Sequence, residues 1–447
     1  MKYFNKTLIA VSVALVSGQT LAAGFQLNSQ SATGIGRAFA GDAVIADNAS
    51  VLSRNPAAMA LFDSKALSMG LTYADIDVDV KDIKLANGMG SSYGSEHDAA
   101  DAKVIPNFYY IQPLSDKWAF GVAAFSNFGT GTDTSALANN MIDLPSAPGL
   151  PPKMVAPVDL LGNTEVTTIN LNGSLSYRVN EYLSLGAGLD IIYGQGKLTR
   201  NGNLPLGPNG ELVHTDLVNV DADGWAIGGI VGAVFELDKN NRWGVSYRIS
   251  PEFDAKGDIS TFNTQAGAMV EFDKITIPLP DIFQIAGFHQ ITEKFALHYT
   301  AQLSTWGDFD QITVKDGSIG GAVAVPDSAL KHYKWDDSWL FSVGATYQVS
   351  DKWTVRAGFM HDKGVVDSLS SISIPDSDRN WYTAGASYQL SPNSAIDMGV
   401  AFVRGQDVTV LEESAVLAPL EPIGGNYITA STRSNAVYYS VQYSYSF

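Results

Sequence analysis

The chain ends in "VYYSVQYSYSF", residues 437–447, where apolar and polar side chains alternate. This period of two predicts a β-strand with two different faces. One face carries Val437, Tyr439, Val441, Tyr443, Tyr445 and Phe447. The other is largely small and polar, with Tyr438, Ser440, Gln442, Ser444 and Ser446. An apolar outer face and a polar inner face are what a strand needs in a membrane-spanning β-barrel.

The same alternation recurs from about residue 66 onward, and two kinds of break interrupt it. Short polar turns, often followed by an aromatic residue, occur at residues 115–117, 180–181, 238–242, 292–294, 350–352 and 391–393. Long irregular segments occur near residues 81–103, 130–163, 201–221, 257–273, 314–334, 364–378 and 411–432. The two kinds alternate along the chain. We therefore expect fourteen antiparallel strands with short periplasmic turns and long outer loops, which is the plan of outer-membrane barrels.

The N-terminus has the features of an export signal. Lys2 and Lys6 precede an apolar run from Leu8 to Val16, and small residues follow up to Ala22. This pattern predicts a signal peptide over residues 1–22. The run is too short for a spanning helix, which needs about 20 apolar residues. No later segment is apolar over that length either.

Composition excludes several classes of function. The chain has no cysteine, so it has neither disulfides nor thiolate metal sites. Its net charge of −18 argues against nucleic acid as a partner, because phosphate binding needs clustered Lys and Arg. We expect no metal site and no cofactor. The histidines lie in no recognisable catalytic constellation, so we expect no enzyme activity.

Residues 23–64 do not alternate and are rich in Gly, Ala and Ser. We expect them to form a hatch inside a barrel of residues 65–447, as plugs do in larger barrels. A periplasmic tail is the alternative.

Several motifs resemble those of the outer-membrane long-chain fatty-acid transporters, the FadL family. They are "AGFQLN" (residues 23–28), "GIGRA" (34–38), "SRNPA" (53–57), "VIPN" (104–107), "SNFG" (126–129) and "ISIPDSDR" (372–379). They occur in order along nearly the whole chain, and the long loops match least. The resemblance implies an all-β fold, a fourteen-stranded antiparallel transmembrane barrel plugged by an N-terminal hatch. It also implies passive uptake of long-chain fatty acids across the outer membrane, where the protein contacts lipid. We expect a monomer, because nothing in the sequence suggests the trimer contacts of porins.

The resemblance also assigns a head-group site. Arg200, Lys331 and Ser126 match the residues that contact the carboxylate in the family, with Lys334 as a rival to Lys331. The physical requirement agrees, because a buried carboxylate needs cationic donors to replace its water. The alternative is that each basic residue simply pairs with an acid near a loop base.

Further roles follow from the same resemblance. Asn127, Phe128 and Gly129 match a kink that forms a lateral opening in the barrel wall, and Asp362 matches an acid near it. A glycine within a strand favours such a bend, although a plain strand end is the alternative. Asn55, Pro56 and Ala57 either end a short helix or fix the hatch near the opening. Phe25 matches a residue inserted into the lumen pocket, and we expect its displacement to couple ligand arrival to exit.

The stretch "GLPPKMVAPVDLLG", residues 149–162, is an unusually apolar loop. Its prolines exclude a regular helix or a central strand. We expect its apolar side chains to form an extracellular groove that collects acyl chains, with residues 319–325 as the facing wall. These side chains are Leu150, Met154, Val155, Val158, Leu160 and Leu161. The alternative is that they pack on a neighbouring loop.

The substrate stays open at this stage. Other hydrophobic molecules, such as aromatic hydrocarbons, are the alternative to fatty acids. A general porin is less compatible with the long segment before the first strand. A second role as a phage receptor is not excluded by the sequence.

Overall fold

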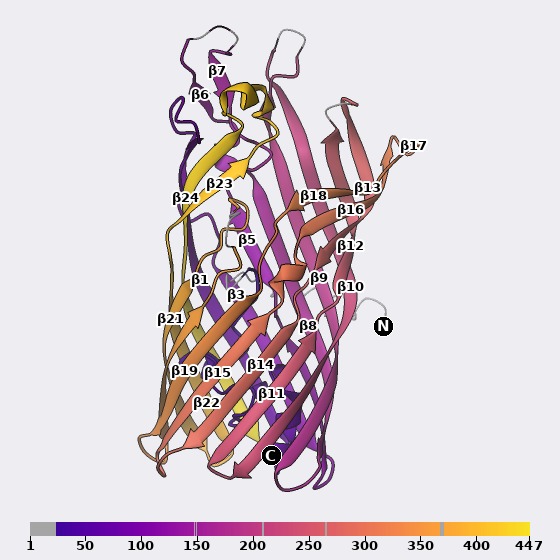
Figure 1. The fold of residues 1–447 in the computed structure, drawn as a ribbon. Coiled ribbons are helices and arrows are strands. Elements are labelled where there is room, and N and C mark those ends of the chain that lie inside the picture. Colours follow the sequence, from indigo (N-terminus) through magenta and orange to yellow (C-terminus); the bar gives the residue numbers. More distant parts are fainter. Residues whose placement is uncertain (1–23, 147, 149, 208–209, 264–265, 367–370) are drawn as a thin grey trace.

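The structure, a computed structural model, describes residues 24–447 except 147, 149, 208, 209, 264, 265 and 367–370. The expected signal peptide, residues 1–22, lies outside the described residues. Long strands form one antiparallel sheet that closes into a barrel (Figure 1). In the described part of the chain the wall has fourteen strands, which confirms the predicted fold class and strand number.

The wall strands are β1 (Ala66–Leu85), β3 (Lys103–Pro113), β4 (Trp118–Phe125), β8 (Asn163–Arg178), β9 (Leu183–Leu204), β10 (Val213–Asp238), β11 (Asn241–Ile249), β14 (Ile282–Gln290), β15 (Phe295–Ser304), β19 (Ser338–Gln348), β20 (Trp353–Asp362), β21 (Arg379–Ser391), β22 (Ser394–Gly405) and β24 (Tyr427–Ser446). Further strands add to the wall and to the long-loop end: β2 (Gly94–Glu96), β5 (Gly129–Asp133), β6 (Met141–Asp143), β7 (Lys153–Val155), β12 (Glu252–Asn263), β13 (Ala268–Pro278), β16 (Gln311–Ile319), β17 (Val323–Val325), β18 (Ser328–His332) and β23 (Val408–Glu413).

The first and last wall strands close the barrel. β1 pairs with β3 on one side and with β24 on the other, from Ala66 opposite Ser446 to Leu85 opposite Ile428. Pairing of the first strand with the last closes the sheet, as a lipid environment requires.

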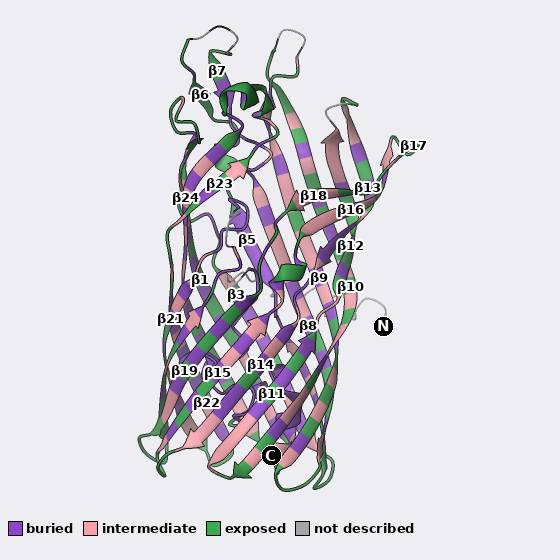
Figure 2. Cartoon of the chain, viewed as in Figure 1, coloured by how far each residue is buried: buried purple, intermediate pink, exposed green. Residues whose placement is uncertain are grey.

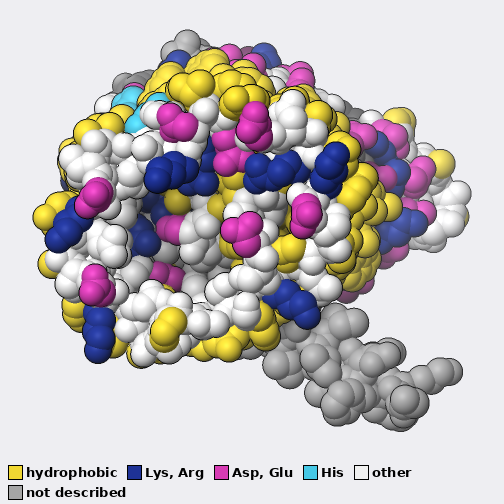
Figure 3. Space-filling model, turned by 90° about the horizontal axis from the view of Figure 1, so that it is seen from below, with side chains coloured by type: hydrophobic (Ala, Val, Ile, Leu, Met, Phe, Trp, Pro, Cys, Tyr) yellow, Lys and Arg dark blue, Asp and Glu magenta, His cyan; other side chains and the backbone are white. Residues whose placement is uncertain are grey.

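Burial follows the predicted alternation along each strand (Figure 2). In β24, Tyr438 and Gln442 are almost fully buried, whereas Tyr439 and Val441 are about half exposed, at 52% and 50%. The exposed apolar side chains form the outer surface. Trp118, Tyr182 and Trp353 are exposed at the short-turn end, where an aromatic girdle is expected. Seen from that end, Lys and Arg side chains lie close to Asp and Glu side chains (Figure 3).

The hatch, residues 24–62, lies in the lumen. It contains α2 (Ala32–Gly36) and the 3-10 turns η1 (Ala49–Ser53) and η2 (Pro56–Leu61). The remaining 3-10 turns are η3 (Ser135–Leu137), η4 (Trp306–Asp308) and η5 (Ala418–Ile423). Among the described residues, no helix is both long and apolar enough to cross a membrane.

Side-chain oxygens begin the hatch helices. Ser31 Oγ accepts a hydrogen bond from the Gly34 amide, and Asn48 Oδ1 accepts one from Ser50. Asn55 Oδ1 does the same for Ala57. Each cap satisfies an amide that the helix leaves without a partner.

An ion-pair network links the hatch to the wall through Asp47 and Arg356. Arg37 of the hatch lies 2.8 Å from Asp42 and 2.7 Å from Asp47, and Arg356 of β20 lies 3.2 Å from Asp47. Both arginine side chains are almost fully buried. Removing one partner of such a network leaves a buried charge uncompensated, so the network holds the hatch in place.

Candidate functional site

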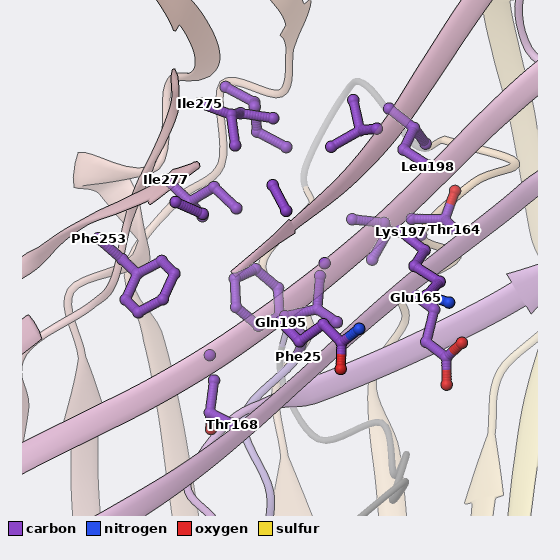
Figure 4. A pocket seen from close by; sticks show the side chains of 18 of the residues that line it. Phe25, Thr164, Glu165, Thr168, Gln195, Lys197, Leu198, Phe253, Ile275 and Ile277 are labelled. Atoms are coloured by element: carbon purple, nitrogen blue, oxygen red, sulfur yellow. The ribbon is translucent and has the colours of Figure 1, made fainter. Parts of the chain in front are cut away.

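A pocket of about 750 Å³ lies within the upper barrel wall and lumen (Figure 4). One side is apolar, with Phe253, Ile275 and Ile277. The opposite side carries Thr164, Glu165, Gln195 and Lys197. The lining is mainly apolar with a few polar groups, which is the composition of small-molecule sites. It therefore suits a mainly apolar molecule.

Phe25 lines the pocket and is 2% exposed. Its ring centroid lies 4.7 Å from that of Trp306 and 5.4 Å from that of Phe309, in edge-to-face arrangements. Phe128 of the wall lies 6.0 Å away. The hatch thus contributes an aromatic side to the pocket at the residue expected there.

Arg200 lies beside the pocket rather than in its lining. Its guanidinium donates hydrogen bonds to the carbonyl oxygens of Asn163 and Thr199 and to Thr164 Oγ1, at 2.7–2.8 Å. These oxygens are uncharged, and the side chain is buried. A guanidinium has five N–H donors, more than these described contacts use. Through Thr164, which lines the pocket, Arg200 reaches the polar end of the cavity.

Lys331 lies in β18 and is already paired. Its Nζ lies 2.5 Å from Glu412 Oε1 in β23 and donates to Ser371 Oγ at 2.6 Å. Tyr333, which lines the pocket, has its ring centroid 5.5 Å from the same Nζ. The alternative raised by the sequence, an ion pair with an acid, is thus what the structure shows for Lys331. Its rival Lys334 is exposed.

Ser126 lies away from both cations. It is buried at the end of β4, and its carbonyl oxygen accepts a hydrogen bond from Gln30 Nε2 of the hatch at 3.0 Å. It does not line the pocket. The structure therefore brings Arg200 and Lys331 to the pocket's surroundings, and it places Ser126 at the break in the wall.

The wall is interrupted between β4 and β5. β3 pairs with β4 only from Phe108 to Pro113, and β5 pairs with β8. Within the described ladders β3 has no pairing with β5. The interruption, called the wall break here, spans residues 126–128. Glycine at position 129 begins β5.

The hatch covers the wall break as a short extra strand. Gln26 forms an isolated antiparallel bridge with Phe128. The Leu27 amide donates to the Asn127 carbonyl at 2.7 Å, and the Gly129 amide donates to the Phe25 carbonyl at 2.9 Å. The first residues of the hatch therefore satisfy backbone groups of Asn127 and Gly129, while Thr168 Oγ1 of β8 bonds the amide and carbonyl of Phe128.

One of the two alternatives for residues 55–57 needs correction. Asn55 begins η2 instead of ending a helix, and its Nδ2 donates to the carbonyl oxygens of Ala43, Ala233 and Val245. Asn55, Pro56 and Ala57 thus lie against β9–β11, because Gly186 and Gly232 leave room for them there. Asp362 ends β20, where its backbone pairs with Leu340 of β19 and Arg379 of β21. Its expected place near the lateral opening stays a prediction.

The apolar loop does not form the expected open groove. Met154, Val155, Val158, Leu160 and Leu161 are all less than 9% exposed, and Leu150 packs against the same cluster. They are covered by apolar residues of other long loops, including Tyr93, Leu417 and Leu420, and by Leu144 of their own loop. The hydrophobic effect favours this closure when no ligand fills the space. The expected facing wall lies apart, because β17 projects from another side of the mouth (Figure 1).

Lys197, Gln195 and Glu412 are not among the site residues predicted from the sequence. Lys197 lines the pocket and lies 3.3 Å from Asp221 on β10. A signal for Lys197 existed, because it precedes Arg200 on β9 by three residues. Glu412 gave no signal, because its partner Lys331 is 81 residues away.

Known proteins give a consistent match. A family profile described as "Outer membrane protein transport protein (OMPP1/FadL/TodX)" matches residues 13–142 and 152–447. "Long-chain fatty acid transport protein" of Salmonella typhi is 32% identical over 437 residues, covering 92% of this chain and 94% of that protein. "Outer membrane protein P1" of Haemophilus influenzae is 29% identical, with full coverage of both chains.

Solved structures share the fold. A Pseudomonas aeruginosa FadL homologue has a TM-score of 0.76 at 23% identity, covering 95% of this chain and 100% of that one. The Pseudomonas putida toluene transporter TodX has a TM-score of 0.63 at 20% identity, covering 96% and 100%.

Proposed function

Because the chain belongs to the outer membrane protein transport family (OMPP1/FadL/TodX), and is therefore an outer-membrane barrel, we propose that it takes up long-chain fatty acids. Uptake is passive and involves no chemical conversion. Relatives about 32% identical over most of the chain are named long-chain fatty acid transport proteins, which supports this substrate class.

One observation carries the proposal, namely an apolar pocket with a buried guanidinium at its polar end. Burying an acyl chain contributes roughly 0.8 kcal/mol per methylene, so the chain supplies affinity. The carboxylate loses water on entry and needs charged donors in exchange. Arg200 fits this need, because its described hydrogen bonds end on uncharged oxygens. In this proposal Lys331 is the second head-group ligand.

The route continues from the pocket to the wall break. Phe25 contacts both, since it lines the pocket and its carbonyl oxygen accepts from Gly129. We propose that ligand in the pocket displaces Phe25, frees residues 25–27 from the break, and opens a lateral exit beside Asn127, Phe128 and Gly129. The loop residues 150–161 serve as the first contact for acyl chains when the loops separate.

Uptake of uncharged hydrophobic molecules, such as aromatic hydrocarbons, is a second candidate function. The lysines near the pocket favour it, because Lys331 pairs with Glu412 and Lys197 with Asp221. Both charges are thus at least partly neutralised before any ligand arrives. The two candidates differ in what they require of Arg200.

The deciding experiment compares oleate with oleyl alcohol, which has the same chain and no charge. Equilibrium binding to the purified protein in detergent is measured for wild type, Arg200→Gln and the exposed control Arg404→Gln. Fatty-acid uptake predicts that Arg200→Gln weakens oleate binding by about tenfold or more, equivalent to about 1.4 kcal/mol, and leaves the alcohol unchanged. Circular dichroism checks that each barrel is folded.

Equal binding of both ligands, with Arg200→Gln without effect, favours uncharged substrates. If neither oleate nor oleyl alcohol binds, both candidate functions are contradicted.

A further inference from the structure

Glu412 occupies a position that suits the head group of an anionic ligand. Its carboxylate lies 2.5 Å from Lys331 Nζ and is only 11% exposed. Its Oε1 also accepts a hydrogen bond from Ser371 Oγ at 3.3 Å, and its Oε2 accepts one from the Ile372 amide at 3.0 Å. One carboxylate thus receives donors from two separate segments of the long-loop end.

Lys331 completes the same cluster. Besides Glu412, its Nζ donates to Ser371 Oγ at 2.6 Å and to Ser373 Oγ at 3.0 Å. The two hydroxyls lie 2.8 Å apart. Lys331 and Glu412 together hold residues 371–373 through four described hydrogen bonds.

The held segment separates two apolar regions. Ile372 is fully buried in the cluster that contains the loop residues Val158 and Leu161. Ile374, two residues on, lines the pocket and belongs to its cluster. Residues 371–374 therefore form a partition between the outer loops and the pocket. A change that loosens residues 371–374 would therefore connect the outer-loop cluster with the pocket.

Lys331 is one of the two expected head-group cations, and Glu412 is its described charged partner. A ligand carboxylate has the same charge and geometry as the Glu412 side chain, so both compete for the same donors.

We propose that Glu412 is an internal competitor for Lys331 that makes opening of the partition depend on an anionic ligand. It neutralises Lys331 while the protein is empty. An incoming fatty-acid carboxylate replaces it there, Glu412 releases the Ile372 amide, and the partition loosens. An uncharged ligand does not displace Glu412. This inference rests on the proposed fatty-acid uptake and adds a residue that couples head-group binding to access.

A double-mutant cycle tests the exchange. Binding of oleate and oleyl alcohol is measured for wild type, Glu412→Gln, Lys331→Gln, the double variant and the exposed neighbour control Glu413→Gln. Glutamine retains an amide oxygen for Ile372 and removes the competing charge. We expect Glu412→Gln to tighten oleate binding about tenfold and to leave the alcohol unchanged. The gain disappears in the Lys331→Gln background, because the cation being competed for is gone.

A second readout follows the partition itself. The chain has no cysteine, so Ile372→Cys introduces a unique thiol. In the empty protein this buried thiol reacts slowly with a maleimide. Oleate is expected to raise the labelling rate severalfold, whereas oleyl alcohol leaves it unchanged.

The outcomes separate the two proposals. If wild type binds oleate but Glu412→Gln behaves like Glu413→Gln, the exchange is overturned and fatty-acid uptake stands. The exchange is also overturned if Glu412→Gln tightens oleate binding in the Lys331→Gln background. The same holds if oleate and oleyl alcohol give equal labelling rates of Ile372→Cys. If wild type binds neither ligand, the proposed function fails, and the exchange fails with it.

Discussion

At the scale of single residues, Asp159 joins two extracellular loops through one carboxylate. Its Oδ1 accepts a hydrogen bond from Ser414 Oγ at 2.6 Å, and its Oδ2 accepts one from the Ala415 amide at 2.7 Å. Burial raises the pKa of this carboxyl above its usual range, although the two hydrogen bonds oppose the shift. The closed loops therefore bind a proton at Asp159 more readily than separated loops do.

This raised pKa makes loop closure pH-dependent. As the pH rises from the ordinary Asp pKa of about 3.9 through the raised value, the contribution of Asp159 to closure falls. Asp159→Asn does not titrate, so its closure is expected to stay constant over that window. Hydrogen exchange of residues 153–161, corrected for intrinsic rates, measures the difference. The exposed Asp143→Asn in the same loop should follow wild type, and a pH dependence that survives in Asp159→Asn contradicts the assignment.

Single residues also show which parts of the candidate site the sequence could not predict. The family resemblance pointed to Arg200 and Phe25; the structure places Phe25 in the pocket lining and Arg200 beside it, and their roles stay predictions. The ion pair of Lys331 could not be predicted, because folding brings Glu412 to it from 81 residues away. Apolar content likewise identified residues 150–161 as unusual, yet did not reveal that other loops cover them.

At the scale of elements, the N-terminal segment acts as a strand added to an incomplete wall. The alternation predicted the wall strands, since each needs one lipid-facing side. Gly129 indicated a break, but the partner of the break was not predictable. The partner segment, residues 25–27, is too short for a periodic pattern, and only three-dimensional closure places it beside Phe128.

A reversible cross-link tests whether this segment must leave for uptake. The hydrogen bonds from Leu27 to Asn127 and from Gly129 to Phe25 lie on either side of the bridge between Gln26 and Phe128. Gln26 and Phe128 are therefore a non-hydrogen-bonded pair, whose Cα atoms are about 4.5 Å apart. That spacing suits a disulfide. We expect Gln26→Cys with Phe128→Cys to block oleate uptake by cells when oxidised and to restore it on reduction. Each single variant serves as a control; undiminished uptake by the oxidised pair rules out the displacement.

At the scale of the whole molecule, wall and hatch fit together through glycine. A Cβ at Gly186 would lie 2.3 Å from the Ala57 amide nitrogen, and one at Gly232 would lie 2.0 Å from Asn55 Oδ1. A Cβ at Gly358 would lie 2.3 Å from the Arg37 carbonyl carbon. By contrast, a Cβ at Gly173, on the neighbouring strand β8, meets nothing within 4 Å.

Gly186→Ala is therefore expected to push η2 away from the wall. Overpacking of this kind costs about 1–3 kcal/mol of unfolding free energy. It should also raise ion conductance through the barrel, because the plug no longer seals against β9. Urea unfolding and conductance in planar bilayers measure the two effects. Gly173→Ala should match wild type in both, and equal behaviour of the two variants contradicts a sealing contact at Gly186.

The close fit of hatch and wall has an evolutionary consequence. Positions 186, 232 and 358 are spread over more than a third of the chain, yet each is held to glycine by a hatch segment fewer than sixty residues from the start. A larger side chain on either surface requires a compensating change on the other. The hatch and the lumen-facing wall therefore cannot diverge independently, whereas the lipid-facing residues of the same strands are free to vary among apolar types.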